Sequence, residues 1–181
     1  MKETAKNFLD KYSSILWIVG FVLLLGLYFA RWFTPEMGEN VMIDEGLNCL
    51  LGLFAGIYFL AVFVVAIIKK EFATATLKTK FKRVIAGIVG VAFLVFSTYS
   101  VYKVVSDLSN GTEVIKLTNI EFYETRRIKG RTTYSIEGIN SETGEFGSYQ
   151  ISYDACEQYV GEDSVFLEYY PKTQRVVDCF K

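Results

Sequence analysis

Three long runs of apolar residues dominate the first part of the chain and predict three membrane-spanning helices. The runs cover residues 15–33, 47–68 and 84–105. A helix rises about 1.5 Å per residue, so each run is long enough to cross a hydrocarbon core of roughly 30 Å. No Asp, Glu, Lys or Arg lies in the middle of a run. Residues 1–106 are therefore expected to form a membrane domain.

The first run also has to be compared with a secretory signal peptide, because lysines precede it. A signal peptide has a shorter apolar region and a small-x-small cleavage site after it. This run ends in Ala30-Arg31-Trp32-Phe33 and no such site follows. We therefore expect an uncleaved helix with interfacial aromatic residues near both ends.

Basic residues outside the runs indicate the orientation of the helices. The segment before the first run contains three lysines, whereas residues 34–46 contain acidic residues and no basic one. Segment 69–83 contains six basic residues, which are Lys69, Lys70, Lys78, Lys80, Lys82 and Arg83. The positive-inside rule then places the N-terminus and this segment in the cytoplasm, and everything after Val105 outside. We expect these six side chains to contact the inner membrane surface.

Small residues spaced four apart suggest where the helices pack. Such spacing lets two backbones approach closely. The pairs are Gly26/Ala30, Gly52/Gly56 and Ala86/Gly90. We expect the first two helices to close a hairpin at the first two pairs, and a homo-oligomer through one of these faces is a further option. The alternative is that glycine is simply frequent in membrane helices.

Residues 113–181 have a different pattern, with short alternating apolar segments separated by turn residues. Such a pattern predicts strands. Expected strands cover 114–124, 132–139, 145–153, 164–170 and 175–180, with a short helix at 154–160 whose N-cap is Asp154. A change of phase at Thr118-Asn119 predicts a β-bulge. Three strands, a helix and two strands fit a small five-stranded barrel, either OB-like or SH3-like.

Several turn and strand motifs of this second domain resemble a known family. They are Thr133-Tyr134, Glu142-Thr143-Gly144, Gly161-Glu162-Asp163-Ser164-Val165, Tyr169-Tyr170-Pro171 and Val176-Val177. They resemble a widespread, uncharacterised bacterial family of membrane-anchored small β domains. The resemblance covers residues 113–181 alone. It implies a small β fold and a location in the bacterial envelope, and it implies no catalytic residue. The three expected helices would place the chain in the bacterial plasma membrane.

The two cysteines of the second domain have two interpretations. An extracytoplasmic location favours a disulfide between Cys156 and Cys179, which would join the short helix to the last strand. The alternative is that both are small core residues, because free cysteine is often buried. Cys49 lies within the second apolar run and is not expected to pair with either.

Two groups of side chains in the second domain are candidates for contacts with partners. A basic hairpin contains Arg126, Arg127, Lys129 and Arg131. It would contact lipid phosphates or an anionic polymer, although a charged hairpin tip is most often only solvated. Nucleic acid is not expected outside the cell. Exposed tyrosines of this domain would suit a protein partner.

Composition argues against an enzyme. The chain contains no histidine, and this removes the commonest general base and metal ligand. No nucleophile elbow, phosphate-binding loop or metal-ligand cluster occurs, so neither a cofactor nor a metal is expected. The absence of intramembrane charges argues against a transporter.

Two functional hypotheses follow from these observations. In the first, the chain is a non-enzymatic integral membrane protein that presents a small interaction domain at the outer membrane face, as an accessory or immunity-type subunit. In the second, the barrel is a membrane-anchored sensor or ligand-binding module that reports through the third helix.

Overall fold

The computed structural model describes residues 18–30, 33–34, 37–69, 71–125 and 132–181. Its described residues form two compact units. The helical unit consists of those up to Phe33 together with Leu47–Val101, and the barrel unit consists of those in Thr34–Gly46 and Tyr102–Lys181. The boundary therefore divides two long helices, α2 (Val41–Ile68) and α4 (Leu77–Asn110), so that one end of each belongs to the barrel unit.

Two of the described helices, α2 and α4, are long and apolar enough to cross a membrane. The first apolar run forms a shorter helix, Ile18–Ala30, within the described residues. The predicted count of three transmembrane helices is therefore not confirmed. Residues 15–17 and 31–32 of that run lie outside the description.

Both long helices extend beyond the apolar runs that were expected to cross the membrane. The first helical turns of α2 include Asp44, which was expected in a loop. Segment 69–83 was also expected to be a loop, but it contains α3 (Glu71–Thr74) and the beginning of α4. At its other end α4 continues to Asn110, where Gly111 at φ +82° donates its N–H to the carbonyl of Asp107 at 2.8 Å. Apolar residues mark the depth of the hydrocarbon, whereas capping marks the ends of a helix.

Small residues let α2 and α4 approach each other closely. A Cβ added at Gly90 would lie 2.7 Å from the backbone nitrogen of Leu60, and one added at Gly56 would lie 2.7 Å from the Leu94 side chain. Gly52 faces Ser97 in the same way. Gly52 and Gly56 therefore face α4, whereas the sequence analysis paired them with the first helix. A Cβ at Gly26 would meet no atom within 4 Å.

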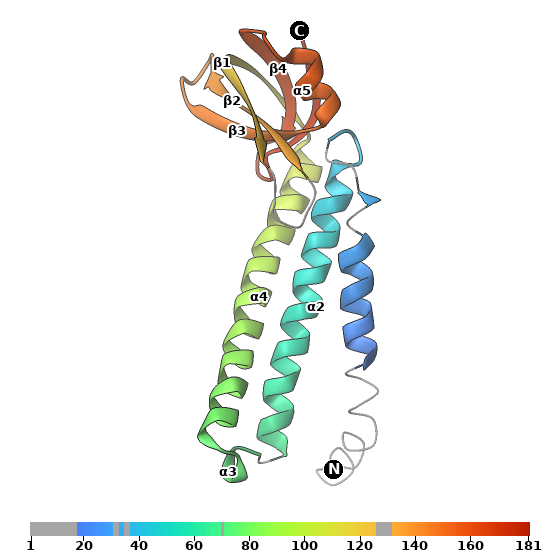
Figure 1. Ribbon diagram of the computed structural model, residues 1–181, viewed down its shortest axis with the longest axis vertical. Coiled ribbons are helices and arrows are strands. Elements are labelled where there is room, and N and C mark those ends of the chain that lie inside the picture. Colours follow the sequence, from blue (N-terminus) through green and yellow to red (C-terminus); the bar gives the residue numbers. More distant parts are fainter. Residues whose placement is uncertain (1–17, 31–32, 35–36, 70, 126–131) are drawn as a thin grey trace. The chain divides into compact units, whose positions relative to one another are not determined.

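The second unit contains a closed five-stranded barrel (Figure 1). Its strands are β1 (Glu113–Thr125), β2 (Thr133–Asn140), β3 (Phe146–Ile151), β4 (Ser164–Tyr170) and β5 (Arg175–Phe180). Their order around the barrel is β1-β2-β3-β5-β4, and β1 also pairs with β4. All pairs are antiparallel except β3 and β5, whose parallel pairing joins Gln150 to Arg175. The predicted closed barrel of five strands is confirmed.

Local sequence signals account for the bends of the barrel. The register of β1 against β2 shifts between Thr118 and Glu121, where Asn119 has a φ of +52°, so the predicted bulge is confirmed. Gly144 at φ +72° completes the turn between β2 and β3. The helix α5 (Tyr153–Tyr159) starts one residue earlier than predicted, and its N-cap is Ser152 instead of Asp154. The Ser152 hydroxyl accepts the N–H of Ala155 at 3.2 Å.

The core of the barrel unit lies inside the closed sheet and under α5. It combines alternating residues of the strands with two residues of α5, Ala155 and Tyr159. The fully buried members include Leu117, Ile136, Ile151, Val165, Leu167 and Val176. Tyr159 places a hydroxyl in this apolar interior, where it donates to the carbonyl of Cys179 at 2.8 Å. This hydrogen bond ties α5 to β5.

Candidate functional site

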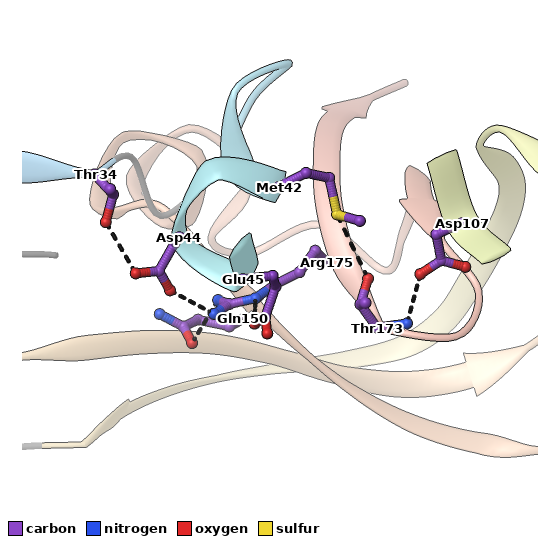
Figure 2. A network of polar contacts seen from close by, with 8 residues as sticks. All are labelled: Thr34, Met42, Asp44, Glu45, Asp107, Gln150, Thr173 and Arg175. Carbon is purple, nitrogen blue, oxygen red and sulfur yellow. Dashed lines mark hydrogen bonds and ion pairs between the residues drawn. The ribbon is translucent and has the colours of Figure 1, made fainter. Parts of the chain in front are cut away.

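A buried polar cluster joins the barrel to the ends of α2 and α4, and all of it lies within the barrel unit. We call it the polar clamp. It consists of the side chains of Asp44, Glu45, Asp107 and Arg175 together with the backbone N–H groups of Lys172 and Thr173 (Figure 2).

Arg175 lies at the centre of the clamp. Its Nε donates to Oε1 of Glu45 at 2.6 Å, and its Nη2 donates to Oδ2 of Asp44 at 2.8 Å. Its Nη1 lies 3.4 Å from the side-chain oxygen of Gln150. The Arg175 side chain is only 14% exposed, so water screens these ionic contacts weakly.

The position of Arg175 follows from barrel closure. It is the first residue of β5, and its backbone pairs with Gln150 where β3 and β5 close the barrel. The preceding residue, Gln174, has a φ of +58° and donates its N–H to the carbonyl of Tyr170 at 2.7 Å. This turn leads into β5, whose first residue, Arg175, contacts the beginning of α2.

Two acidic residues of the clamp, Asp44 and Glu45, belong to the first helical turns of α2. Carboxylates are favourable there because the helix dipole places partial positive charge at this end. Asp44 accepts a second hydrogen bond from the hydroxyl of Thr34 at 2.9 Å. Neighbouring Val41 and Met42 are buried, so this end of α2 is held by apolar packing as well as by charge.

Asp107 forms the second half of the clamp, near the end of α4. Asp107 as a whole residue is only 1% exposed, so its carboxylate is buried. Oδ1 accepts the N–H of Lys172 at 2.9 Å and Oδ2 accepts the N–H of Thr173 at 2.7 Å. One carboxylate therefore satisfies two amides in the turn between β4 and β5, and Figure 2 shows the contact with Thr173. Such charge-assisted hydrogen bonds are stronger than neutral ones.

The clamp places two carboxylates on one guanidinium and a third on two backbone amides, and the charge of that third carboxylate, Asp107, affects a nearby tyrosine. Burial raises the pKa of Tyr169, and the charges of Glu113 and Asp107 raise that pKa further. Burial also raises the pKa of Tyr149, whose ring packs edge-on against Tyr169 with centroids 5.3 Å apart. Both hydroxyls therefore stay protonated at neutral pH.

The contacts of the clamp hold structural elements together. Its carboxylates accept hydrogen bonds from a guanidinium and from backbone amides, which never act as acids at neutral pH. Within the part of the chain that the structure describes, no group of three or more His, Cys, Asp or Glu side chains could hold a metal ion. The arrangement can fix three elements against one another.

The two cysteines of the barrel are free thiols in the structure, so the disulfide considered from the sequence is not formed. Cys179 is buried in the core, and Cys156 of α5 packs against this core. Burial, together with the charge of Asp178, raises the pKa of Cys179 to about 12. The hydrogen bond from Tyr159 to the Cys179 carbonyl joins the same helix and strand that the disulfide would have joined.

The other sequence-derived candidates lie elsewhere. The basic hairpin Arg126, Arg127, Lys129 and Arg131 lies outside the described residues, as does Lys70. Lys69 follows the end of α2, whereas Lys78, Lys80, Lys82 and Arg83 lie on the first turns of α4. None of these described basic residues belongs to the clamp. Of the packing pairs, Gly52, Gly56 and Gly90 lie at the contact of α2 with α4.

Sequence analysis missed all four side chains of the clamp. Asp44 and Glu45 were considered only as acids of segment 34–46, which contains no basic residue, and Asp107 lies between the two predicted domains. One signal was available: Asp107 is an acid near the end of a helix, where the dipole disfavours negative charge. Such a residue needs a compensating donor, and the sequence does not say which one.

Comparison with known proteins gives no match to a family model, to a curated protein or to a solved structure. The candidate site therefore rests on its geometry.

Proposed function

We propose that this chain is a non-enzymatic integral membrane protein that holds a small β-barrel interaction domain at the extracytoplasmic face of a bacterial plasma membrane. In this role it serves as an accessory or immunity-type subunit with a protein partner. The polar clamp carries the proposal. Its buried contacts tie the barrel to the ends of both apolar helices, and a domain presented at a surface needs such a fixed attachment.

Two long apolar helices support a membrane location, and the proposal adds a third crossing and an orientation. We propose that the helix containing Ile18–Ala30 also crosses the membrane, which makes three crossings. The lysine-rich segments before the first crossing and between the second and third then lie in the cytoplasm. The barrel lies outside.

The strand order of the barrel, with parallel β3 and β5 and a helix between β3 and β4, favours the OB type over the SH3 type.

Exposed apolar side chains on β2 and β3 support an interaction role. Ile139 and Phe146 are direct cross-strand partners and both point outward, with exposures of 37% and 68%. Aromatic residues flanked by polar ones are typical of protein-binding surfaces. We propose this pair as part of the surface that contacts the partner.

Two experiments test the proposal. A periplasmic-type phosphatase fused after Lys181 is expected to be active, and one fused after Thr79 inactive; the reverse pattern overturns the orientation. A photo-crosslinking amino acid at position 146 in the full chain is expected to give a discrete protein adduct in native membranes. The same group at Thr143, in the adjacent turn, serves as the control for random collision. Absence of adducts from position 146 and from position 139 contradicts an interaction surface on this sheet.

The clamp also favours the second hypothesis, a sensor, because a ligand that moved β5 would pull on the ends of α2 and α4. Spin labels at Ile68 and Leu77, at the opposite ends of these helices, distinguish the two functions. A distance distribution that changes in Arg175→Gln indicates transmission through the helices and favours a sensor. An unchanged distribution favours a passive attachment.

A further inference from the structure

The first turns of α4 expose a continuous apolar stripe. Leu77 is 85% exposed and Phe81 is 66% exposed, and the stripe continues through the exposed residues Ile85 and Ile88. These residues follow one another at spacings of four, four and three, so they share one helix face. The stripe therefore runs from the polar beginning of α4 into its apolar span without a break.

Lysines flank this stripe on both sides. At about 100° per residue, Lys78 and Lys82 project beside one edge and Lys80 beside the other. Lys78 and Lys82 are both exposed. Long lysine side chains can lay their methylene groups along apolar surface while their ammonium groups reach outward.

Local packing holds this end of α4 in place. Phe72, in the short helix before α4, packs edge-on against Phe63 of α2 with ring centroids 6.0 Å apart. The carbonyl of Thr76 accepts the N–H groups of Thr79 and Lys80, both at 3.0 Å. The exposed stripe and its lysines are therefore part of an ordered helix.

We propose that the first two turns of α4 bind the headgroups of anionic phospholipids, with Leu77 and Phe81 in the interfacial layer and Lys78, Lys80 and Lys82 on the phosphates. The stripe is continuous with the membrane-spanning face of the same helix, so its occupant is the same bilayer. The positive charges complement an anionic headgroup, and each is worth about fivefold in binding near an anionic surface. This inference rests on α4 crossing the membrane, which is part of the proposed function.

Lipid selectivity of the full chain tests the inference. Trp17→Phe and Trp32→Phe remove the native fluorophores, and Leu77→Trp places one at the surface in question. The protein is reconstituted into mixed vesicles in which either phosphatidylglycerol or phosphatidylcholine carries bromine as a quencher. Quenching is expected to favour brominated phosphatidylglycerol at low salt, and the preference is expected to fall as salt rises.

Charge variants make the test specific. Lys78→Gln/Lys82→Gln is expected to lower the preference by about fivefold for each lysine at low salt. Lys116→Gln/Lys181→Gln removes the same charge from the barrel and is expected to leave the preference unchanged. Equal quenching by both lipids, or an equal loss in the two double variants, overturns the inference. A chain that inserts into vesicles without lipid preference refutes this inference alone, whereas failure to float with vesicles also refutes the proposed membrane placement.

Discussion

Arg175 and Asp44 form a buried ion pair at 2.8 Å although 131 positions separate them in the chain. One lies at the first residue of the last strand, and the other lies in the first helical turns of an apolar helix. Their contact ties the end of α2 to the point where the barrel closes. The following predictions examine this contact, the other half of the clamp and the attachment of α5.

Removing the guanidinium is expected to destabilise the barrel unit strongly. Arg175→Met leaves the carboxylates of Asp44 and Glu45 buried without their cation, and breaking a buried pair in this way costs about 3–5 kcal/mol. Calorimetry of the detergent-solubilised chain measures the loss. Lys181→Met removes an exposed ion pair with Glu162 at 2.8 Å, and its cost is expected to stay under about 1 kcal/mol. Similar costs for the two variants would show that the clamp is not a strong contact.

The turn between β4 and β5 is expected to open when Asp107 loses its charge. Asp107→Asn keeps the shape but offers one acceptor oxygen to two N–H groups, so one donor is left unsatisfied at a cost of about 1–3 kcal/mol. Hydrogen exchange at Lys172 and Thr173 should then accelerate by about tenfold for each 1.4 kcal/mol lost. Asp178→Asn, at the other end of β5, should leave both amides unchanged. Unaltered exchange in Asp107→Asn would mean that its hydrogen bonds do not hold the turn.

Tyr159 is expected to attach α5 through its hydroxyl. Tyr159→Phe keeps the ring in the core but removes the hydrogen bond to the Cys179 carbonyl, and it leaves that carbonyl without this donor. The expected cost is about 1–2 kcal/mol, measured as a lower melting temperature. Tyr153→Phe is the matched control, because that ring is exposed. If the two variants have the same melting temperature, packing alone holds α5.

The Cys179 thiol is expected to stay unreactive in the folded chain and to make stability fall at alkaline pH. Its pKa is raised from 9.0 to about 12, so the folded state holds this proton more tightly than the unfolded state. The corresponding stabilisation is complete below about pH 9 and is lost as pH rises towards 12. Iodoacetamide should label Cys179 slowly in the native protein up to about pH 10 and both barrel cysteines readily after unfolding.

Cys179→Ala supplies the control for the pH dependence. It removes the titrating group, so stability should fall less steeply between pH 9 and pH 11 than in the parent chain. Tyr149 and Tyr169 also have raised pKa values, so part of the alkaline decrease is expected to remain. Failure of the two cysteines to label in the unfolded, unreduced protein would instead indicate a disulfide.

Much of the architecture was predictable from local sequence. Alternating apolar residues placed β4 and β5 at their observed bounds, because a strand with one buried face repeats every second residue. The phase change at Thr118-Asn119 located the bulge, where Asn119 has a positive φ. Apolar length likewise identified α2 and α4 as candidate membrane spans, since that property depends on composition alone.

Only the tertiary structure decided which groups meet. Hydropathy gave no reason to continue α2 back to Val41 or α4 on to Asn110, because the added turns are stabilised by capping and by contacts with the barrel. Pairing between Arg175 and Asp44 depends on how the barrel closes, and no local pattern encodes a contact across 131 positions. The sequence by itself determined the elements and the depth of the apolar spans. The fold decided that two acids meet one arginine and that a third acid meets the backbone of the adjacent turn. A buried charge needs a partner, and here each partner lies far along the chain.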